Sequence, residues 1–398
     1  MTQINVLHMA HLTIRYGAEK QLLDYLALTQ DTPNEIKHHV CALRVNNPID
    51  EELKSMGIPT IVTRLWPWNV VEFSKFLKAH DIHILHVHNQ LRFPLRSRIL
   101  PKLAGVPLIV EHEHGMVWNT FSTRLIHWTQ GLVDANICNS NAAKIMLKQK
   151  CDIEARVIYN GVPVPHNGEE EQVRLRLREE LGLPENAKIV GFVGRLNNPK
   201  GPEAFIRMVP AVSRAVPQAK FVVVGDGPMR TSLENEVRNL GVEKQVYFLG
   251  YRKNPFHLLE QLDVVVVPSF REAFGNISIE AALAKKPVVA SSVDGLAETV
   301  IDGETGFLVD CTEPIQTRIK GTSRLPQAVV DGRSRQLRPP YLPNTEMLAE
   351  KVIQCLQQPE MAHSLGEKAY LRAVDSFSLE RYRNDLDDLY RELMIHNA

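Results

Sequence analysis

Residues 264–282, VVVVPSFREAFGNISIEAA, run from four consecutive valines through a short loop into a helical pattern. Continuous β-branched residues are typical of a strand buried on both faces of a parallel sheet. In such sheets ligands bind beyond the carboxyl ends of the strands, and the free amides at the start of a helix attract anions. The stretch therefore predicts an open α/β fold with an anion site near residues 274–277.

Two carboxylates flank this predicted helix start. Glu272 lies on the loop, and Glu280 follows eight residues later, about one turn into the helix. Carboxylate oxygens at these two places can accept hydrogen bonds from hydroxyl groups on different parts of one ligand. Taken singly, each glutamate would be interpreted as a solvated surface charge. The strand, loop and helix around them favour a binding role.

The same alternation of strand and helix patterns extends in both directions, and it is typical of parallel sheets joined by crossover helices. The strands predicted in the first half are 4–9, 38–44, 82–88, 108–112, 135–139 and 156–159. Those predicted in the second half are 189–193, 221–224, 246–249, 264–267, 287–290 and 306–309. Two sets of six strands predict two Rossmann-like domains.

The length of 398 residues also favours two cores over one. Proline and glycine in NGVPVP, residues 160–165, indicate a boundary. We predict domains over 1–165 and 188–374, joined by a linker and helix over 166–187, and a C-terminal crossover helix over 375–398 that packs back on the first domain. An insertion at 313–344, rich in proline and in Lys and Arg, is interpreted as a functional or disordered loop.

The composition limits the class of protein. Apolar residues make up 44%, charged residues 23%, and the formal net charge is zero. These values are typical of a soluble enzyme and argue against disorder and against nucleic-acid binding. The sequence has no apolar run of membrane-spanning length and no signal-peptide profile. Five scattered cysteines favour a reducing compartment, so we expect a cytoplasmic protein.

Further motifs add to the 264–282 stretch: GFVGRLNNPKG at 191–201, VGDGP at 224–228, GLAETV at 295–300 and GFLV at 306–309. Together with the Glu-x7-Glu spacing, they resemble the family 4 retaining glycosyltransferases of group 1, which have the GT-B fold. The resemblance covers almost all of the second half and is thinner in the first. It implies two domains facing across a cleft, with the acceptor on the first and a nucleotide sugar on the second.

The resemblance also implies roles for single residues. Arg195 and Lys200 would contact the donor diphosphate, Glu280 the ribose hydroxyls and Glu272 the transferred sugar. The donor would also meet Gly225 and Gly227 and the backbone of Phe274, Gly275, Asn276 and Ile277. Gly17 matches the family's glycine loop, although Tyr16 stands where a second glycine is common. Arg195, Lys200, Glu272 and His114 are the predicted catalytic residues.

Two histidine-rich strand ends, HVHN at 86–89 and EHEHG at 111–115, could be interpreted as metal ligands. We reject this, because we expect alternating residues of one strand to point to opposite faces and the spacing lacks a structural-zinc pattern. The resemblance instead makes His114 a contact of the donor sugar. His88 and Asn89 would line the acceptor side. We predict no metal and no cofactor besides the donor.

Arg92, Arg96, Arg98 and Lys102 are predicted to form a basic helical face after Asn89. Such a face is either simply solvated or binds anionic lipid headgroups or a lipid-diphosphate acceptor. The second alternative would place the protein at the inner face of the plasma membrane.

The predicted reaction moves a hexose or N-acetylhexosamine from a UDP-sugar, favoured over a GDP-sugar, to a glycan or lipid-linked saccharide in envelope polysaccharide biosynthesis. By resemblance it retains the anomeric configuration. Two alternatives stay open: a sugar-nucleotide epimerase or hydrolase of the same fold, and a non-catalytic nucleotide-sugar-binding scaffold.

Overall fold

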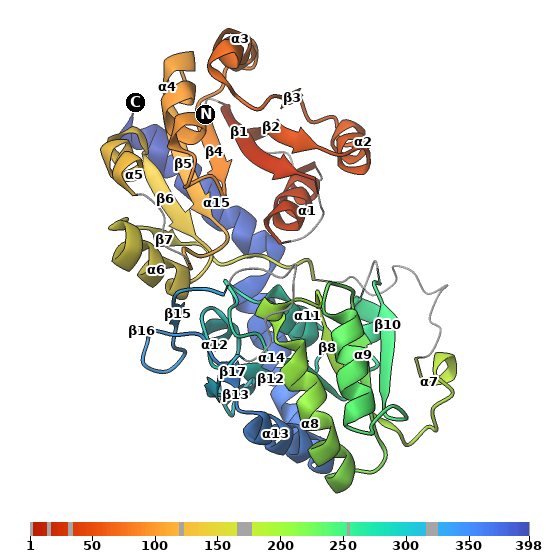
Figure 1. Cartoon of the computed structure of the whole chain (residues 1–398). Helices are drawn as coiled ribbons and strands as arrows, with labels where there is room; N and C mark the ends of the chain where they lie inside the picture. Colours follow the sequence, from red (N-terminus) through yellow and green to blue (C-terminus); the bar gives the residue numbers. More distant parts are fainter. Residues whose placement is uncertain are drawn as a thin grey trace. The chain divides into compact units, whose positions relative to one another are not determined.

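The computed structural model describes residues 3–13, 17–30, 35–118, 123–164, 177–252, 255–315 and 325–397 (Figure 1). The chain divides into two compact units. Unit 1 is Met1–Pro163 with Phe377–Ala398, and unit 2 is Val164–Ser376. Most of the predicted linker, 166–176, and Tyr16 lie outside the described residues.

Unit 1 is built on a seven-stranded parallel sheet with the order β3-β2-β1-β4-β5-β6-β7. Its strands are β1 (Ile4–Leu12), β2 (Ile36–Val45), β3 (Thr60–Val62), β4 (Ile84–His88), β5 (Leu108–Glu113), β6 (Ala135–Cys138) and β7 (Arg156–Val157). The six strands predicted for this half are present. The edge strand β3 was missed because three residues are too few to show a period. The strand order reverses between β1 and β4, where ligands bind in sheets of this type.

Helices cover both faces of the sheet in unit 1. They are α1 (Ala18–Gln30), α2 (Asn47–Ser55), η1 (Pro67–Asn69), α3 (Val70–Ala79), η2 (Leu95–Ile99), α4 (Leu100–Ala104), α5 (Arg124–Trp128), η3 (Gln130–Leu132), α6 (Asn141–Cys151) and α15 (Leu379–His396). One core contains side chains of α1 and α15, among them Leu26 and Leu386, and the other contains Phe73 of α3 and Leu100 of α4. Each face of the sheet therefore has its own apolar core.

The C-terminal helix α15 packs on unit 1, as predicted, and Figure 1 shows it at the blue end of the chain. Gly161 permits the close approach, because a Cβ there would lie 2.7 Å from the Leu379 Cα and 2.7 Å from the Tyr382 Cβ. Real Cβ atoms do not tolerate such distances to backbone. The Asn-Gly-Val motif at 160–162 therefore packs directly against the start of α15.

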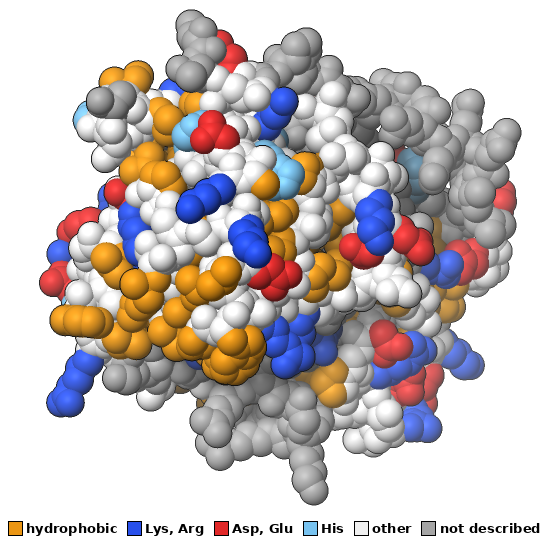
Figure 2. All heavy atoms as spheres, turned by 90° about the horizontal axis from the view of Figure 1, so that it is seen from above, with side chains coloured by type: hydrophobic (Ala, Val, Ile, Leu, Met, Phe, Trp, Pro, Cys, Tyr) orange, Lys and Arg blue, Asp and Glu red, His pale blue; other side chains and the backbone are white. Residues whose placement is uncertain are grey.

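Large apolar side chains are exposed on η1, α3, η2, α4 and α5. They include Trp68, Val71, Phe93, Leu95, Leu103 and Trp128. Figure 2 looks onto the side of unit 1 where α3 and α4 lie and shows hydrophobic side chains gathered there with Lys and Arg among them. We call the six named residues the apolar surface of unit 1. Among the described residues, no helix combines the length and apolarity that crossing a bilayer requires.

Unit 2 is built on a six-stranded parallel sheet with the order β10-β9-β8-β11-β12-β13. Its strands are β8 (Lys188–Val193), β9 (Ala219–Val224), β10 (Val246–Gly250), β11 (Val264–Val267), β12 (Val288–Ser291) and β13 (Gly306–Val309). All six match the strands predicted for the second half. The order reverses between β8 and β11, where ligands bind in sheets of this type. The prediction of two Rossmann-like sheets is confirmed.

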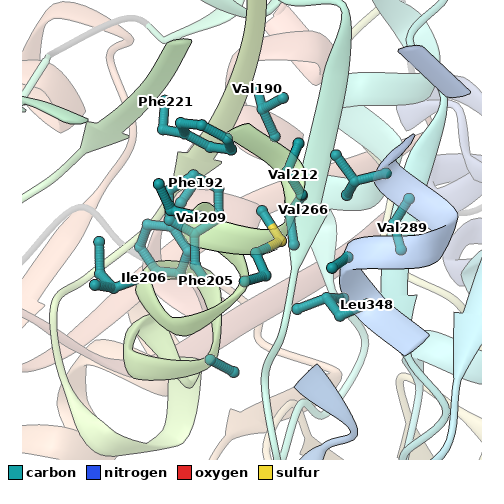
Figure 3. Close-up of a cluster of buried hydrophobic side chains, with 14 of the residues drawn as sticks. Val190, Phe192, Phe205, Ile206, Val209, Val212, Phe221, Val266, Val289 and Leu348 are labelled. Carbon is teal, nitrogen blue, oxygen red and sulfur yellow. The ribbon is translucent and has the colours of Figure 1, made fainter. Parts of the chain in front are cut away.

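The helices of unit 2 are α7 (Leu177–Glu180), η5 (Asn198–Lys200), α8 (Pro202–Ala215), α9 (Arg230–Asn239), α10 (Phe256–Leu259), α11 (Asn276–Leu283), α12 (Leu296–Thr299), α13 (Thr345–Gln357) and α14 (Pro359–Phe377). Figure 3 shows Phe192 and Val266 of the sheet meeting Phe205 and Val209 of α8 and Leu348 of α13. All of them are buried. This core fixes the strand ends that carry the site.

The described part of the insertion is folded onto unit 2. β14 (Cys311–Glu313) pairs with β17 (Leu342–Pro343), and β15 (Val329–Val330) pairs with β16 (Leu337–Arg338), both antiparallel. Asp331 accepts a hydrogen bond from Arg338 Nε at 2.8 Å. These contacts rule out a disordered loop over 325–344, whereas Arg318, Lys320 and Arg324 lie outside the described residues.

Candidate functional site

The loops after β8 and β11 touch through their backbones. Gly201 has a φ of 59°, and a Cβ there would lie 2.1 Å from the Pro268 carbonyl oxygen. The Phe270 amide donates to the Pro199 carbonyl at 3.1 Å. Only glycine allows this approach, so the two loops are held together where the strand order reverses.

This contact brings together two residues predicted separately as donor ligands. Lys200 Nζ lies 2.5 Å from Glu272 Oε2. The Ser269 hydroxyl donates to the same carboxylate oxygen at 3.2 Å. Both side chains of the ion pair are partly accessible, 32% for Lys200 and 14% for Glu272. A cation and a carboxylate therefore meet at the carboxyl edge of the sheet.

A buried aspartate holds the backbone of Glu272. Asp294 Oδ2 accepts a hydrogen bond from the Glu272 amide at 3.1 Å, and its Oδ1 accepts one from the Val330 amide at 2.7 Å. The Asp294 side chain is fully buried, and its φ of 46° is left-handed. Asp294 is not among the residues predicted from the sequence, although an Asp before Gly295 shortly after a strand is typical of a turn with a special conformation.

Helix α11 begins directly behind this loop. Gly275 precedes it with a φ of 98°, and a Cβ there would lie 2.6 Å from Leu296 Cδ2. Phe274 is buried in the core, so its backbone is what a ligand can reach. Asn276 and Ile277 form the first turn, and Glu280 is half-buried in the same helix. The amides of this turn and the Glu280 carboxylate thus share one short element.

Gly225 and Gly227 have a packing role. A Cβ on Gly225 would lie 2.0 Å from the Gly194 carbonyl oxygen, and one on Gly227 would lie 2.3 Å from that of Leu196. The loops after β8 and β9 are joined by the hydrogen bond from the Gly194 amide to the Val224 carbonyl, 2.9 Å. Arg195 directly follows Gly194 in this joined pair of loops, and its side chain is exposed.

In unit 1 the backbone of His114 is held from both sides. Its amide donates to Asn89 Oδ1 at 2.8 Å, and its carbonyl accepts from Asn139 Nδ2 at 2.7 Å. Asn89 itself has a left-handed φ of 56°. Gly17 has a φ of 53° and precedes α1, with open space where a Cβ would stand. These three residues follow β5, β4 and β1 in turn, so they lie at strand ends near the reversal between β1 and β4.

The histidines of unit 1 form two hydrogen-bonded chains. In the first, His114 Nε2 lies 2.8 Å from His88 Nδ1, His88 Nε2 lies 3.1 Å from His8 Nδ1, and His8 Nε2 lies 3.1 Å from His38 Nδ1. All four side chains are buried. Both ring nitrogens of His88 are engaged, so a direct contact with an acceptor would require one of these bonds to break.

The second chain runs beside the first. Tyr390 Oη lies 2.5 Å from His86 Nδ1, and His86 Nε2 lies 3.2 Å from His112 Nδ1. The expectation that alternating histidines point to opposite faces is wrong, because residues i and i+2 of a strand share a face. The rings of His86 and His88 stack with centroids 4.2 Å apart.

Burial keeps these histidines neutral. Desolvation, with smaller contributions from neighbouring histidines, holds the pKa values of His8, His86, His88 and His112 well below 6.5. Burial lowers the pKa of His38 to about 3 and that of His114 to about 3. A neutral imidazole has one donor and one acceptor, which is what a chain of N–H···N bonds requires.

The predicted basic face after Asn89 is wrong at Arg98. Its guanidinium is fully buried and bonds both oxygens of Glu111, at 2.5 and 2.8 Å, and the Ile126 carbonyl at 2.7 Å. Arg98 therefore faces inward, whereas Arg96, two residues earlier in η2, is half-buried. Arg96 lies over the Trp66 ring, 4.1 Å from its centroid. Lys102 pairs with Asp134 at 3.3 Å.

Comparisons with known proteins match both halves of the chain. Residues 173–320 match the family described as glycosyl transferases group 1, and residues 18–164 match the family described as glycosyltransferase family 4. A D-inositol 3-phosphate glycosyltransferase of Corynebacterium glutamicum is 40% identical over 148 residues, which cover 35% of each chain. An uncharacterised glycosyltransferase of Methanocaldococcus jannaschii is 35% identical over 244 residues, 57% of this chain and 62% of that protein. The alignments thus span less than two thirds of these relatives.

A solved structure resembles the chain over its whole length. Anabaena HepE in complex with UDP has a TM-score of 0.75 at 22% identity, and the alignment covers 98% of this chain and 100% of HepE. HepE has also been solved with UDP-glucose. At this identity the likeness shows the shared fold.

Proposed function

Because the chain belongs to the group 1 glycosyltransferases of family 4, we propose that it transfers a sugar from a nucleotide-diphosphate donor to a saccharide acceptor. The pairing of Lys200 with Glu272, at the strand reversal and beside the start of α11, carries the proposal. In this pair a cation that can bind phosphate lies at hydrogen-bonding distance from a carboxylate that can bind sugar hydroxyls.

The donor residues act by charge and position. Lys200 offers a point charge and Arg195 a planar fork to the diphosphate, while the first amides of α11 bind its remaining oxygens. Glu280 accepts the ribose hydroxyls, and Glu272 exchanges its bond with Lys200 for hydroxyls of the transferred sugar. When the nucleoside diphosphate leaves, these fixed groups stabilise the negative charge that develops. This scheme invokes no metal at the diphosphate.

The donor is proposed to be a UDP-hexose or UDP-N-acetylhexosamine, because HepE has been solved with UDP and with UDP-glucose. Thermal stability of the purified protein against UDP, GDP, ADP and CMP tests the base. A ligand at a hundredfold its Kd adds about 2.7 kcal/mol to the folded state. We expect UDP to raise the Tm, and Glu280→Ala to abolish the rise. Glu304→Ala, an exposed carboxylate of the same unit, is the matched control. If no nucleotide shifts the Tm at millimolar concentration, the proposal fails.

A product assay separates transfer from the two alternatives. UDP-sugars are incubated with and without a panel of saccharide acceptors, and products are identified by NMR. A new glycoside with the donor's anomeric configuration supports retaining transfer. Conversion or hydrolysis of the donor without any acceptor would favour the epimerase or hydrolase. Binding of UDP with no turnover of any donor would favour the scaffold.

We assign the acceptor to the glycan or lipid-linked saccharides of envelope polysaccharide biosynthesis, reached from the inner face of the plasma membrane. The apolar surface of unit 1 supports this, because exposed tryptophans beside Lys and Arg are typical of interfacial proteins. Cosedimentation with phosphatidylglycerol vesicles should fall with added salt and in Trp68→Ser combined with Trp128→Ser. Leu371→Ser, which changes a large exposed apolar side chain of unit 2, should bind as the wild type does. Equal binding by all three proteins would count against contact through the apolar surface, and no binding by the wild type would count against membrane contact.

A further inference from the structure

Four neighbouring strands of unit 1 bring six buried histidines to one face of the sheet. β1 supplies His8, β2 supplies His38, β4 supplies His86 and His88, and β5 supplies His112, while His114 directly follows β5. Only His88 and His114 are predicted from the sequence to contact a substrate. A cluster of this size in a core otherwise filled by aliphatic and tyrosine side chains calls for a separate explanation.

The ring nitrogens are placed at the spacing of metal ligands. In two overlapping triads, His8–His86–His88 and His88–His112–His114, one nitrogen of each ring lies within 4.8 Å of the others. Zinc binds histidine nitrogens at about 2.0–2.1 Å, so two ligands of a tetrahedral site stand roughly 3.3–3.4 Å apart. Small rotations of the rings would close either triad around an ion.

In the second triad the hydrogen bonding of the rings is incomplete. His112 Nε2 is buried and lacks a hydrogen-bond partner within the described part of the chain. Its ring stacks on His114 with centroids 3.6 Å apart, and His114 Nε2 lies 2.8 Å from His88 Nδ1. A buried nitrogen without a partner is destabilising, and a metal ion would satisfy it.

The surroundings hold the rings ready for an ion. All three rings are buried, and the neutral imidazole is the form that binds metals. The Tyr390 hydroxyl fixes His86, which in turn contacts His112. Partners of this kind orient ligands and strengthen metal binding.

We propose that His88, His112 and His114 bind one divalent transition-metal ion, with zinc as the ion that fits. A set of three nitrogen ligands selects zinc, cobalt, nickel or copper over magnesium and calcium, which prefer oxygen. Three protein ligands leave a fourth position for water. The ion tethers the carboxyl ends of β4 and β5. The proposal does not rest on the donor contacts proposed for Lys200, Glu272 and Glu280, which belong to unit 2.

The direct test is metal binding to the full chain after treatment with EDTA and removal of the chelator. Zn²⁺ binding is followed by calorimetry and Co²⁺ binding by its visible absorption, which is intense when the site is tetrahedral. We expect one ion per chain, competition between Zn²⁺ and Co²⁺, and no binding of Mg²⁺. If neither Zn²⁺ nor Co²⁺ binds the wild-type protein at micromolar concentration, the proposal is overturned.

Three variants, His112→Gln, His39→Gln and His8→Gln, locate the site. His112→Gln keeps a polar side chain and should weaken Co²⁺ binding at least tenfold. His39→Gln is the matched control, because His39 is also a buried histidine of this sheet but belongs to neither triad. The calorimetric unfolding transition of unit 1, which holds all of these histidines, reports that each variant is folded. The assignment is overturned if His112→Gln binds Co²⁺ as the wild type does, or if His112→Gln and His39→Gln lose Co²⁺ binding equally. It is also overturned if Co²⁺ binding is lost only in His8→Gln, because His8 belongs to the other triad.

Discussion

Lys200 and Glu272 neutralise each other across 2.5 Å, so a ligand that binds either residue competes with the other. An ion pair that is partly exposed contributes little to stability. The ion pair can instead be replaced by bonds to a ligand. When a diphosphate binds Lys200, the Glu272 carboxylate becomes available to accept hydrogen bonds from sugar hydroxyls. Binding of the two halves of a nucleotide sugar is thereby coupled at one pair of atoms.

This coupling predicts opposite effects on UDP, which carries no sugar. Lys200→Gln should weaken UDP binding by roughly tenfold to a hundredfold, because it removes a charge-assisted hydrogen bond of about 1.5–3 kcal/mol. Glu272→Gln should leave UDP affinity unchanged or raise it while sugar transfer falls. Calorimetry with UDP and a transfer assay measure the two effects, with Lys244→Gln, an exposed lysine of the same unit, as control. Equal weakening of UDP in both variants would contradict the exchange.

The Arg98–Glu111 pair is the opposite case, because both side chains are buried. Removing one partner leaves an unpaired buried charge, which typically costs 3–5 kcal/mol. We expect Arg98→Met to lower the free energy of unfolding by that amount, and Arg98→Met with Glu111→Leu to recover part of it. Urea denaturation of the two variants and of Glu111→Leu completes the cycle. Strictly additive losses would show that the pair has no coupling.

At the scale of elements, the strands of unit 1 carry histidines that the folded protein cannot protonate. Their folded pKa values lie below the unfolded value of about 6.5, so below that pH the unfolded chain binds more protons. Stability is therefore complete above pH 6.5 and falls as the pH decreases, by about 1.4 kcal/mol per pH unit for each such histidine. We expect a lower Tm at pH 5.5 than at pH 7.5.

Two carboxyls oppose this trend. Burial raises the pKa of Glu113 to about 7 and that of Glu203 to about 7, so the folded state gains stability from them as the pH falls from 7. Six histidines outweigh two carboxyls, which leaves a net loss in acid. Scanning calorimetry with EDTA present removes any effect of bound metal. A Tm that stays constant from pH 7.5 to 5.5 would show that the cluster is protonated without cost.

The loop contact between β8 and β11 also makes an element-scale prediction. Gly201→Ala places a Cβ 2.1 Å from the Pro268 carbonyl at a φ of 59°, so the two loops must separate. We expect a loss of at least about 1 kcal/mol in stability and weaker UDP binding, because Lys200 and Glu272 move apart. Gly241→Ala, which has a similar φ of 66° with open space around it, separates strain from displacement. It should lose stability only.

Strands and their parallel order were predictable because each strand is a continuous apolar run with a helical pattern after it. The Lys200–Glu272 contact was not, because it depends on Gly201 seating one loop on another 67 residues away in sequence. Arg98 was misplaced because charge alone was taken as exposure and its direction on the helix was not considered. The histidine chains were missed because cross-strand neighbours depend on register, and β4 and β5 align His88 with His112.

For the whole molecule, the path of the chain matters. It begins in unit 1, forms unit 2, and returns to unit 1 as α15. Unit 1 therefore completes its core with residues that follow unit 2 in the chain. Tyr382, Leu386 and Tyr390 of α15 are buried there, and Tyr390 also holds His86. Unit 2 is a continuous segment with its own core.

This difference predicts that damage to α15 affects unit 1 selectively. Leu386→Ala should destabilise unit 1 by about 2–5 kcal/mol, because it leaves a cavity in a buried core. Calorimetry should show the transition of unit 1 moved to lower temperature, while UDP still raises the transition of unit 2 by the wild-type amount. Leu371→Ala, an exposed leucine of α14, should change neither transition. If Leu386→Ala lowers both transitions together and abolishes the UDP shift, the two units unfold as one cooperative body and their separate cores do not act independently.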